Sequence, residues 1–159
     1  MDERLYSLHD SPVGPLLLSG DPVELTGLAF HRGRVPGGWR RDDERFARER
    51  SELEAYFAGD AVAFGFPLRF EGGGRFERRV WEVLREIPYG TTTTYGEIAR
   101  ALGEPDAARA VGAANGRNPI AIVVPCHRVI GAGGKLVGYG GGLDRKLALL
   151  ELEGALLAV

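Results

Sequence analysis

The chain has 159 residues, of which 44% are hydrophobic and 26% are charged, a composition typical of a globular protein with a buried core. No apolar run approaches the ~20 residues that span a bilayer, and the N-terminus lacks the basic and then apolar pattern of a secretory signal. A single cysteine excludes an intrachain disulfide, and with only three histidines it disfavours a structural zinc site. We therefore expect a cytoplasmic protein with no membrane association and no metal.

The formal net charge of −2 hides an asymmetry along the chain. Residues 107–150 hold six basic residues against one acidic residue, a charge of +5, whereas the remainder holds 14 basic and 21 acidic residues, a charge of −7. A basic segment on an acidic chain favours an anionic partner such as nucleic acid. An ordinary solvated surface explains the same pattern, so charge alone leaves both interpretations open.

Residues 1–70 predict a small α/β domain. Residues 13–19 and 23–30 are apolar runs with turn-forming residues between them, which indicates a β-hairpin. Residues 42–57 begin with acidic side chains and are followed by a glycine, which is typical of a helix.

The glycine-rich stretch 71–74 predicts a linker, and residues 75–159 predict a second, largely helical domain. Apolar residues recur at helical spacing over 75–87, 95–102 and 107–114. The last two helices are joined by a tight turn that contains glycine, which matches a helix-turn-helix.

Two further elements follow in the second domain. Residues 127–130 and 135–137 flank a glycine-rich turn, which predicts the β-hairpin "wing" that often follows a helix-turn-helix. Residues 143–153 predict a final helix that turns one row of leucines inward, namely Leu143, Leu147 and Leu150.

The predicted helix over 107–114 has an unusual outer face. Its helical spacing places these residues on the apolar side: Ala107, Ala110, Val111 and Ala114. The opposite side carries only small residues and one arginine: Ala108, Arg109, Gly112, Ala113 and Gly116. A solvated face normally carries Glu, Lys or Gln, so this face permits close approach of an anionic partner. Close packing against another helix is the alternative interpretation.

The only cysteine, Cys126, follows the apolar run Ile120–Val124 and Pro125, and it precedes His127 and Arg128. A free cysteine in such a run is commonly a small buried hydrophobe. The adjacent histidine and the local positive charge instead favour the thiolate, which is the nucleophilic form. Neighbouring side chains in an extended segment point to opposite faces, so a turn or an intervening water would have to connect the thiol to its base. The residues alone leave both roles open.

The run Pro125-Cys126-His127-Arg128-Val129-Ile130 resembles the active-site signature of the O6-alkylguanine-DNA alkyltransferases. Further segments fall in that family's order and spacing over about residues 50–155: Val80-Trp81, Ile87-Pro88-Tyr89-Gly90, Tyr95-Gly96-Glu97-Ile98-Ala99, Arg109-Ala110-Val111-Gly112, Asn118-Pro119, Gly138-Tyr139, Gly141-Gly142-Leu143, Lys146 and Glu153-Gly154. The resemblance implies an α+β protein with a small N-terminal α/β domain and a C-terminal winged helix-turn-helix alkyltransferase domain.

The same resemblance implies a DNA repair activity. The protein would flip an O6-alkylguanine out of double-stranded DNA and transfer the alkyl group irreversibly to Cys126, once per molecule. O4-alkylthymine is a second candidate substrate. The family needs no cofactor, and the zinc of some relatives requires cysteines that are absent here, so we expect neither; we expect a monomer.

The resemblance also implies the roles of individual residues. Cys126 accepts the alkyl group, His127 removes its proton through water, and Glu153 orients the histidine. Asn118 bonds the backbone near the site, and Tyr95 donates a hydrogen bond to guanine N3. The implied DNA-contacting residues are Thr94, Arg109, Ala110, Gly112, Ala113 and Arg128, with Arg109 filling the gap left by the flipped base. The implied base pocket consists of Tyr95, Val129, Tyr139, Gly140 and Gly141, where Gly140 leaves room for bulkier adducts.

Three other classes of protein are alternatives. A damage-binding relative that repairs nothing would lack the acceptor, whereas Cys126 is present. A winged-helix transcription regulator would have no need for Cys126, His127 and Glu153 together. A cysteine hydrolase would regenerate its thiol, so repeated turnover would distinguish it.

Overall fold

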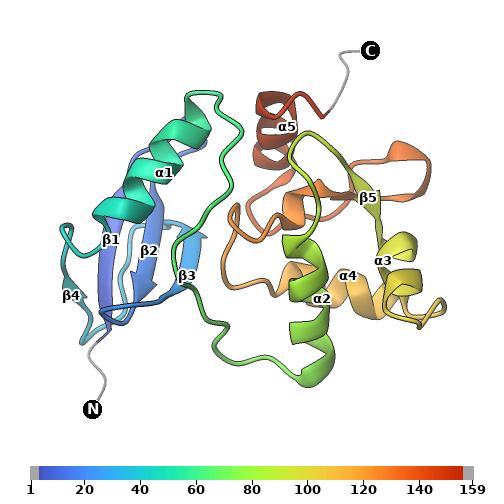
Figure 1. Cartoon of the computed structure of the whole chain (residues 1–159), viewed down its shortest axis with the longest axis horizontal. Coiled ribbons are helices and arrows are strands. Elements are labelled where there is room, and N and C mark those ends of the chain that lie inside the picture. The colour runs from blue at the N-terminus through green and yellow to red at the C-terminus, as the bar shows by residue number, and fades with distance from the viewer. Residues whose placement is uncertain (1–3, 156–159) are drawn as a thin grey trace. The chain divides into compact units, whose positions relative to one another are not determined.

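The computed structural model describes residues 4–155 and divides the chain into two compact units, Met1–Glu71 and Gly72–Val159 (Figure 1). The first unit is built around a sheet and the second is mostly helical. This confirms the mixed α/β class predicted from the sequence. Every helix within the described residues is too short or too polar to cross a bilayer.

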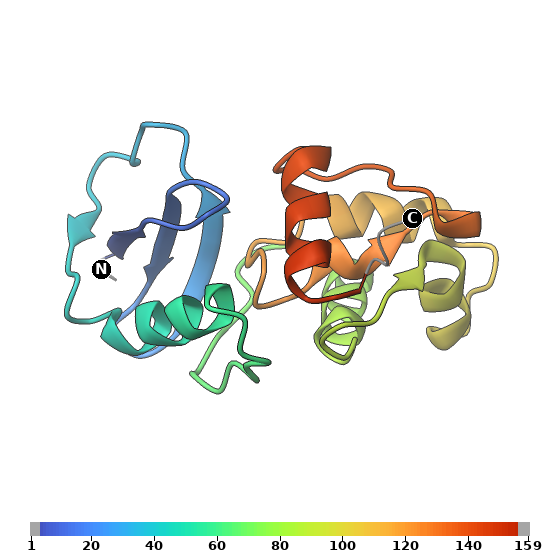
Figure 2. The ribbon, with the colours of Figure 1, turned by 90° about the horizontal axis from the view of Figure 1, so that it is seen from above.

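The first unit is a four-stranded sheet with one helix packed along it (Figure 2). The strands take the order β3-β2-β1-β4 and are bounded as follows: β1 Leu5–His9, β2 Leu16–Gly20, β3 Leu25–Phe30 and β4 Arg40–Arg41. Strand β2 is antiparallel to both of its neighbours, and β4 is parallel to β1. Helix α1 (Ala47–Phe57) buries Leu53 and Tyr56 completely, and these side chains form the core together with apolar strand residues.

The predicted hairpin is confirmed, but its first strand begins at Leu16 because Pro15 has no N–H to donate to a neighbouring strand. The Asp21 carboxylate closes the turn by accepting hydrogen bonds from two backbone N–H groups. Gly20 is required there, since a Cβ would lie 2.2 Å from the Glu24 carbonyl oxygen. Strands β1 and β4 were not predicted. The helix expected over 42–57 begins only at Ala47.

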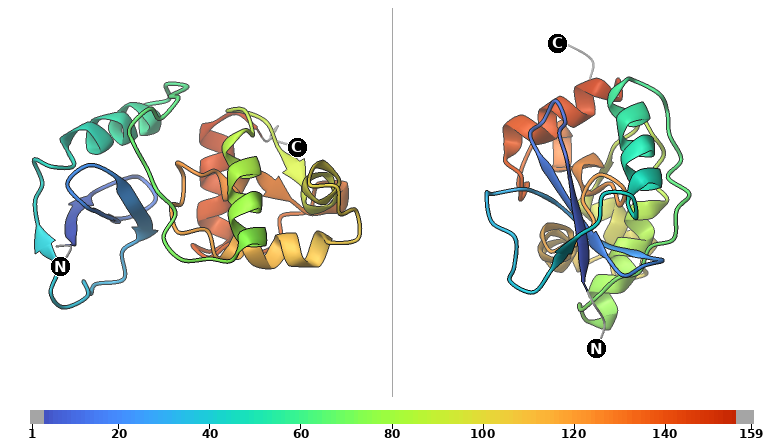
Figure 3. Two further views of the ribbon diagram at one scale, coloured as in Figure 1. Left: turned by 60° about the horizontal axis from the view of Figure 1, so that its bottom comes forward. Right: turned by 90° about the vertical axis from the view of Figure 1, so that its left-hand side faces the viewer.

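In the second unit, helix α4 packs on both α2 and α3 (Figure 3). The elements of this unit are α2 Arg75–Arg85, β5 Thr93–Thr94, α3 Tyr95–Ala101, α4 Ala108–Gly116, the 3₁₀ turns η1 Cys126–Arg128 and η2 Ala132–Gly134, β6 Val129–Ile130 and α5 Leu143–Leu152. The Trp81 indole donates a 2.9 Å hydrogen bond to the Ala114 carbonyl and so ties α2 to α4. The Thr94 hydroxyl caps α3 by accepting from the Glu97 N–H. The three helices predicted over 75–114 are confirmed.

The predicted wing hairpin is wrong. Residues 135–137 form no strand, and β6 pairs in parallel with β5, in register Thr93 with Val129 and Thr94 with Ile130. The chain turns through η2 instead, where Gly133 has a positive φ of 76°. This short parallel ladder fixes the start of α3 beside the segment that follows the cysteine.

Candidate active site

The segment that leads to the cysteine is held by its own backbone and one asparagine. The Asn118 amide donates to the Val124 carbonyl at 2.7 Å, and its oxygen accepts from the Ile120 N–H at 3.0 Å. A second clasp joins the Val124 N–H to the Ile120 carbonyl at 3.0 Å. Between these points, Ile122 adopts φ 72° although it is β-branched and almost completely buried, a conformation that few such residues adopt. These hydrogen bonds therefore fix the backbone conformation of residues 118–124.

Cys126 begins the turn η1 and is 6% exposed. The Asn115 amide donates to its carbonyl oxygen at 3.3 Å. Burial raises the pKa of the thiol, while a hydrogen bond from Asn118 and the positive charge of Lys146 lower it. Because the pKa stays above its ordinary value, the resting side chain is a neutral thiol and its deprotonation needs a base.

His127 follows on the same turn and is completely buried. Its Nε2 lies 2.7 Å from a carboxylate oxygen of Glu153, a residue at the end of α5. Burial lowers the pKa of the imidazole and the Glu153 charge raises it again, with a net lowering. The other ring nitrogen, Nδ1, is buried and has no hydrogen-bond partner within the described chain. With Nε2 protonated and held by the carboxylate, Nδ1 is free to accept a proton.

Arg128 completes this buried group. Its Nε and one terminal nitrogen donate to the two oxygens of Glu153 at 2.7 and 2.9 Å, and the other terminal nitrogen donates to the Ile87 carbonyl at 2.7 Å. The guanidinium also lies over the Tyr89 ring. The expectation that Arg128 contacts DNA is therefore wrong, because the side chain is 7% exposed and each of its three nitrogens is bonded inside the unit. It fixes the Glu153 carboxylate instead.

Tyr95 opens α3 and brings its hydroxyl to the loop before α5, where it donates to the Val137 carbonyl at 3.3 Å. Burial raises the pKa of Tyr95, and also that of Tyr139 in the same loop, so both phenols remain hydrogen-bond donors near neutral pH. Gly140 is exposed, and a Cβ built there would have no atom within 4 Å. Gly141 accepts a hydrogen bond from Arg145, and Val129 is completely buried beneath the site.

Helix α4 exposes a face of small residues as predicted, but two residues lie on the other side from the one expected. Arg109, Ala113 and Gly116 are exposed. Gly112 instead lies against the Tyr95 ring, 3.8 Å from a Cβ built on it. Ala110, placed on the inner side by the helical spacing, is exposed. Thr94, which caps α3, is only half-buried.

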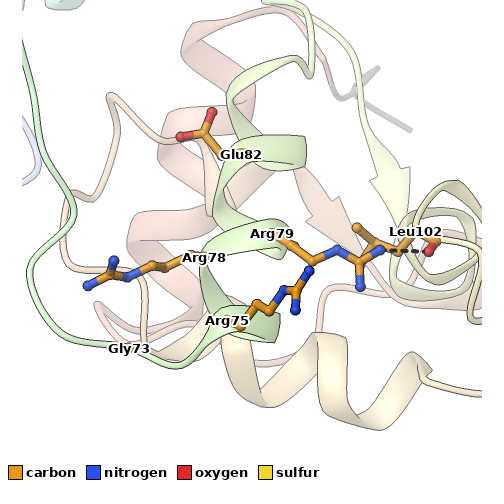
Figure 4. A pocket seen from close by; sticks show the side chains of 6 residues that line it. All are labelled: Gly73, Arg75, Arg78, Arg79, Glu82 and Leu102. Carbon is orange, nitrogen blue, oxygen red and sulfur yellow. Dashed lines mark hydrogen bonds between the residues drawn. The ribbon is translucent and has the colours of Figure 1, made fainter.

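A shallow pocket of about 580 Å³ lies beside these helices, at the first turn of α2. Three arginines and one glutamate are among its six lining residues: Gly73, Arg75, Arg78, Arg79, Glu82 and Leu102. Arg75 and Arg79 extend to the same side of α2, toward Leu102 (Figure 4), where Arg79 donates to the carbonyl of that residue at 2.9 Å. Arg75 is exposed and makes no hydrogen bond or ion pair with the described residues.

Two buried residues of the site received no role from the sequence: Asn115 was not singled out, and Lys146 was noted only as a position that matches the family. The inward row of α5 is Lys146, Leu149 and Leu150, whereas Leu143 is 47% exposed. A leucine pattern alone points to a different face because lysine is normally assigned to solvent. Within the described residues, no group of three His, Cys, Asp or Glu side chains is arranged to hold a metal ion.

Comparison with known proteins gives two family matches that together span most of the chain. Residues 75–155 match the 6-O-methylguanine DNA methyltransferase DNA binding domain, and residues 4–70 match the ribonuclease-like domain of the same family. A methylated-DNA--protein-cysteine methyltransferase of Methanosarcina acetivorans is 53% identical over 154 residues, covering 94% of this chain and 98% of that protein. One from Mycobacterium leprae is 56% identical over 149 residues, covering 91% and 88%.

Solved structures agree with these sequence matches. The crystal structure of Mycobacterium tuberculosis OGT in complex with DNA has a TM-score of 0.89 and 53% identity, covering 94% of this chain and 92% of that one. An O6-methylguanine DNA methyltransferase from Methanococcus jannaschii has a TM-score of 0.64 and 28% identity, covering 91% of each chain.

Proposed function

The chain belongs to the 6-O-methylguanine DNA methyltransferase family, and from the geometry of its site we propose that Cys126 is the residue that receives the alkyl group. The protein is a DNA repair transferase that reverses alkylation directly and acts once per molecule. Its proposed substrate is double-stranded DNA that contains O6-alkylguanine, with O4-alkylthymine as a second candidate. The main support for the proposal is that His127, which directly follows the only cysteine, is buried and hydrogen-bonded to the Glu153 carboxylate.

The reaction needs a base, and His127 is positioned for that role. Glu153 holds the Nε2 proton, so Nδ1 accepts the thiol proton, relayed by a water molecule because side chains on consecutive residues do not face each other. The Cys126 sulfur then bonds to the alkyl carbon while the carbon–O6 bond breaks and its electron pair moves to guanine. No external cofactor takes part, and the thioether that forms does not revert.

The leaving guanine needs a hydrogen-bond donor, and Tyr95 supplies it. Its phenol is neutral and lies at the edge of the site, so turning it from the Val137 carbonyl toward guanine N3 stabilises the departing anion. Tyr139, Gly140 and Gly141 form the far wall of the base pocket. Gly140 is exposed and a Cβ built on it has no atom within 4 Å, so larger side chains fit at this position, and we propose that their size limits the adducts that the pocket accepts.

Helix α4 is the proposed DNA-reading element. Its exposed face of alanine and glycine fits closely into a minor groove, and Arg109 enters the base stack where the damaged nucleotide has left. Arg75, which is exposed and free of internal partners, adds a contact to the phosphate backbone from the first turn of α2. These contacts do not depend on the base sequence of the DNA, as expected for a protein that must find damage at any position.

Mass spectrometry of the Cys126 peptide after incubation with a duplex that contains O6-methylguanine tests the proposal. We expect a gain of about 14 Da on that cysteine, at most once per molecule, because methyl replaces the thiol proton. Cys126→Ser should bind the same duplex with unchanged affinity and transfer nothing. Repeated turnover would indicate a hydrolase, and methylation elsewhere would contradict the assignment of the acceptor.

We further infer that the protein works in the cytoplasm and as a monomer. A free thiol that must stay reduced is best kept in a reducing compartment. Reaction at one cysteine, with its base and carboxylate on the same chain, does not require a second copy. Size-exclusion chromatography with light scattering, at several protein concentrations, tests the monomeric state.

A further inference from the structure

Helix α5 carries two buried charged residues on the face that packs against the η1 turn. Glu153 at its end meets His127 and Arg128. Lys146 lies seven positions earlier, two helical turns away on the same face, and is completely buried. Glu153 therefore has two partners on η1, the His127 imidazole and the Arg128 guanidinium. The partners of the buried Lys146 ammonium are of a different kind.

The Lys146 ammonium donates to the carbonyl oxygens of Val137 and Gly138, at 2.8 and 3.2 Å. Both acceptors are neutral, and no carboxylate within residues 4–155 is at ion-pair distance from it. Burying an ammonium without a counter-charge is unfavourable by several kcal/mol. Burial accordingly lowers the pKa of Lys146, and the charge of Cys126 is the one influence that raises it again.

The two carbonyls place this ammonium at the wall of the base pocket. The Val137 oxygen that accepts from Lys146 also accepts from the Tyr95 hydroxyl, so the lysine, the phenol and the loop meet at one atom. Cys126 acts electrostatically on both Tyr95 and Lys146. Lys146 thus shares a carbonyl acceptor with Tyr95 at the pocket loop, and within the described residues it makes no hydrogen bond to the thiol.

We propose that Lys146 supplies the counter-charge for the Cys126 thiolate during alkyl transfer, with the Val137 and Gly138 carbonyls fixing the position of its ammonium. This rests on Cys126 being the alkyl acceptor. His127 takes the thiol proton, the thiolate displaces the alkyl carbon from O6, and Lys146 stays protonated throughout. It is a positioning residue that acts through the sulfur and contacts neither the alkyl carbon nor the guanine.

The single cysteine makes this coupling measurable without DNA. The rate at which iodoacetamide modifies the protein reports the Cys126 thiolate alone, and its pH midpoint gives the apparent pKa of the thiol. The ionisable groups on the elements around this thiol belong to η1, the end of α5, α3 and the pocket loop: His127, Arg128, Lys146, Glu153, Tyr95 and Tyr139. Of these groups, only Lys146 is changed in the variants.

Lys146→Met removes the charge, Lys146→Gln removes the charge but keeps a donor for the carbonyls, and Lys146→Arg keeps both. We expect the Met and Gln variants to raise the pH midpoint by about one unit and to slow alkyl transfer at neutral pH about tenfold, since one unit is a tenfold change in thiolate. The Arg variant should shift it less. Lys135→Met, which removes an exposed lysine from the neighbouring loop, should change neither quantity.

Thermal unfolding and duplex affinity are measured on every variant, so that misfolding and DNA binding are separated from reactivity. A Gln variant that folds and keeps the wild-type pH midpoint overturns the proposal, and so does a loss of transfer in which iodoacetamide reactivity is unchanged, because Lys146 would then act only through the pocket wall. Failure of the wild-type protein to take a methyl group from DNA would instead refute the assignment of Cys126 as the acceptor. The effect of Lys146 on the thiol would then still be decided by the iodoacetamide rates of the variants.

Discussion

Substitutions of Ile122 can measure the backbone strain in the segment that leads to Cys126. Its φ of 72° lies in the left-handed region, which costs a residue with a Cβ roughly 1–2 kcal/mol and glycine almost nothing. We consider Ile122→Ala and Ile122→Gly. Both lose the packing of a side chain that is 1% exposed, about 2–5 kcal/mol, but only the glycine variant also loses the strain.

We therefore expect the glycine variant to be more stable than the alanine variant by about 1 kcal/mol, which raises the melting temperature of a unit of this size by about 4–8 °C. Urea and thermal denaturation measure the difference. The matched control is Ala148→Gly at an exposed position of α5, where glycine should lower stability by about 0.5–1 kcal/mol. An alanine variant as stable as the glycine variant at position 122 would refute the strain.

Glu153→Gln leaves a buried guanidinium without its counter-charge, so the unfolding free energy measured in urea should fall by about 3–5 kcal/mol. Arg109→Ala should slow repair of duplex DNA much more than reaction with free O6-benzylguanine, because the free base needs no flipping; equal losses would contradict its role in the stack. Arg75→Ala should reduce the slope of log affinity against log salt by about 0.9, whereas Arg85→Ala at the other end of α2 should not. Because burial lowers the pKa of His127, the unfolded chain binds more protons, and stability should fall as the pH drops below about 6.5; His127→Asn should make that fall smaller.

The grouping of residues at the centre of the site could be predicted because most of them belong to one short run of sequence. Cys126 and His127 directly follow the segment 118–125 that leads to them, and the regular spacing of apolar residues predicts the helices around them. The strand Val129–Ile130 was assigned the wrong partner because its true one, Thr93–Thr94, is far away in the chain and pairs in parallel. Turn residues report local hairpins and carry no information about such distant pairing.

The burial of charged residues inside the second unit also could not be predicted from the sequence. Arg128 is a charged side chain in a basic segment, so sequence reasoning assigned it to DNA, and Lys146 was given no role because a lysine is normally expected at the surface. Their burial depends on groups contributed by other elements: the Glu153 carboxylate in the first case and two loop carbonyls in the second. Such partners are defined only after the chain has folded.

The depth at which Cys126 lies also determines how long a molecule that acts once remains usable. Oxidants attack exposed thiolates first, and the products beyond sulfenic acid do not revert. A side chain that is 6% exposed, with its pKa raised by burial, is protected on both counts. Under the role proposed for Cys126, burial therefore keeps the one thiol that accepts the alkyl group reduced until the protein meets damaged DNA.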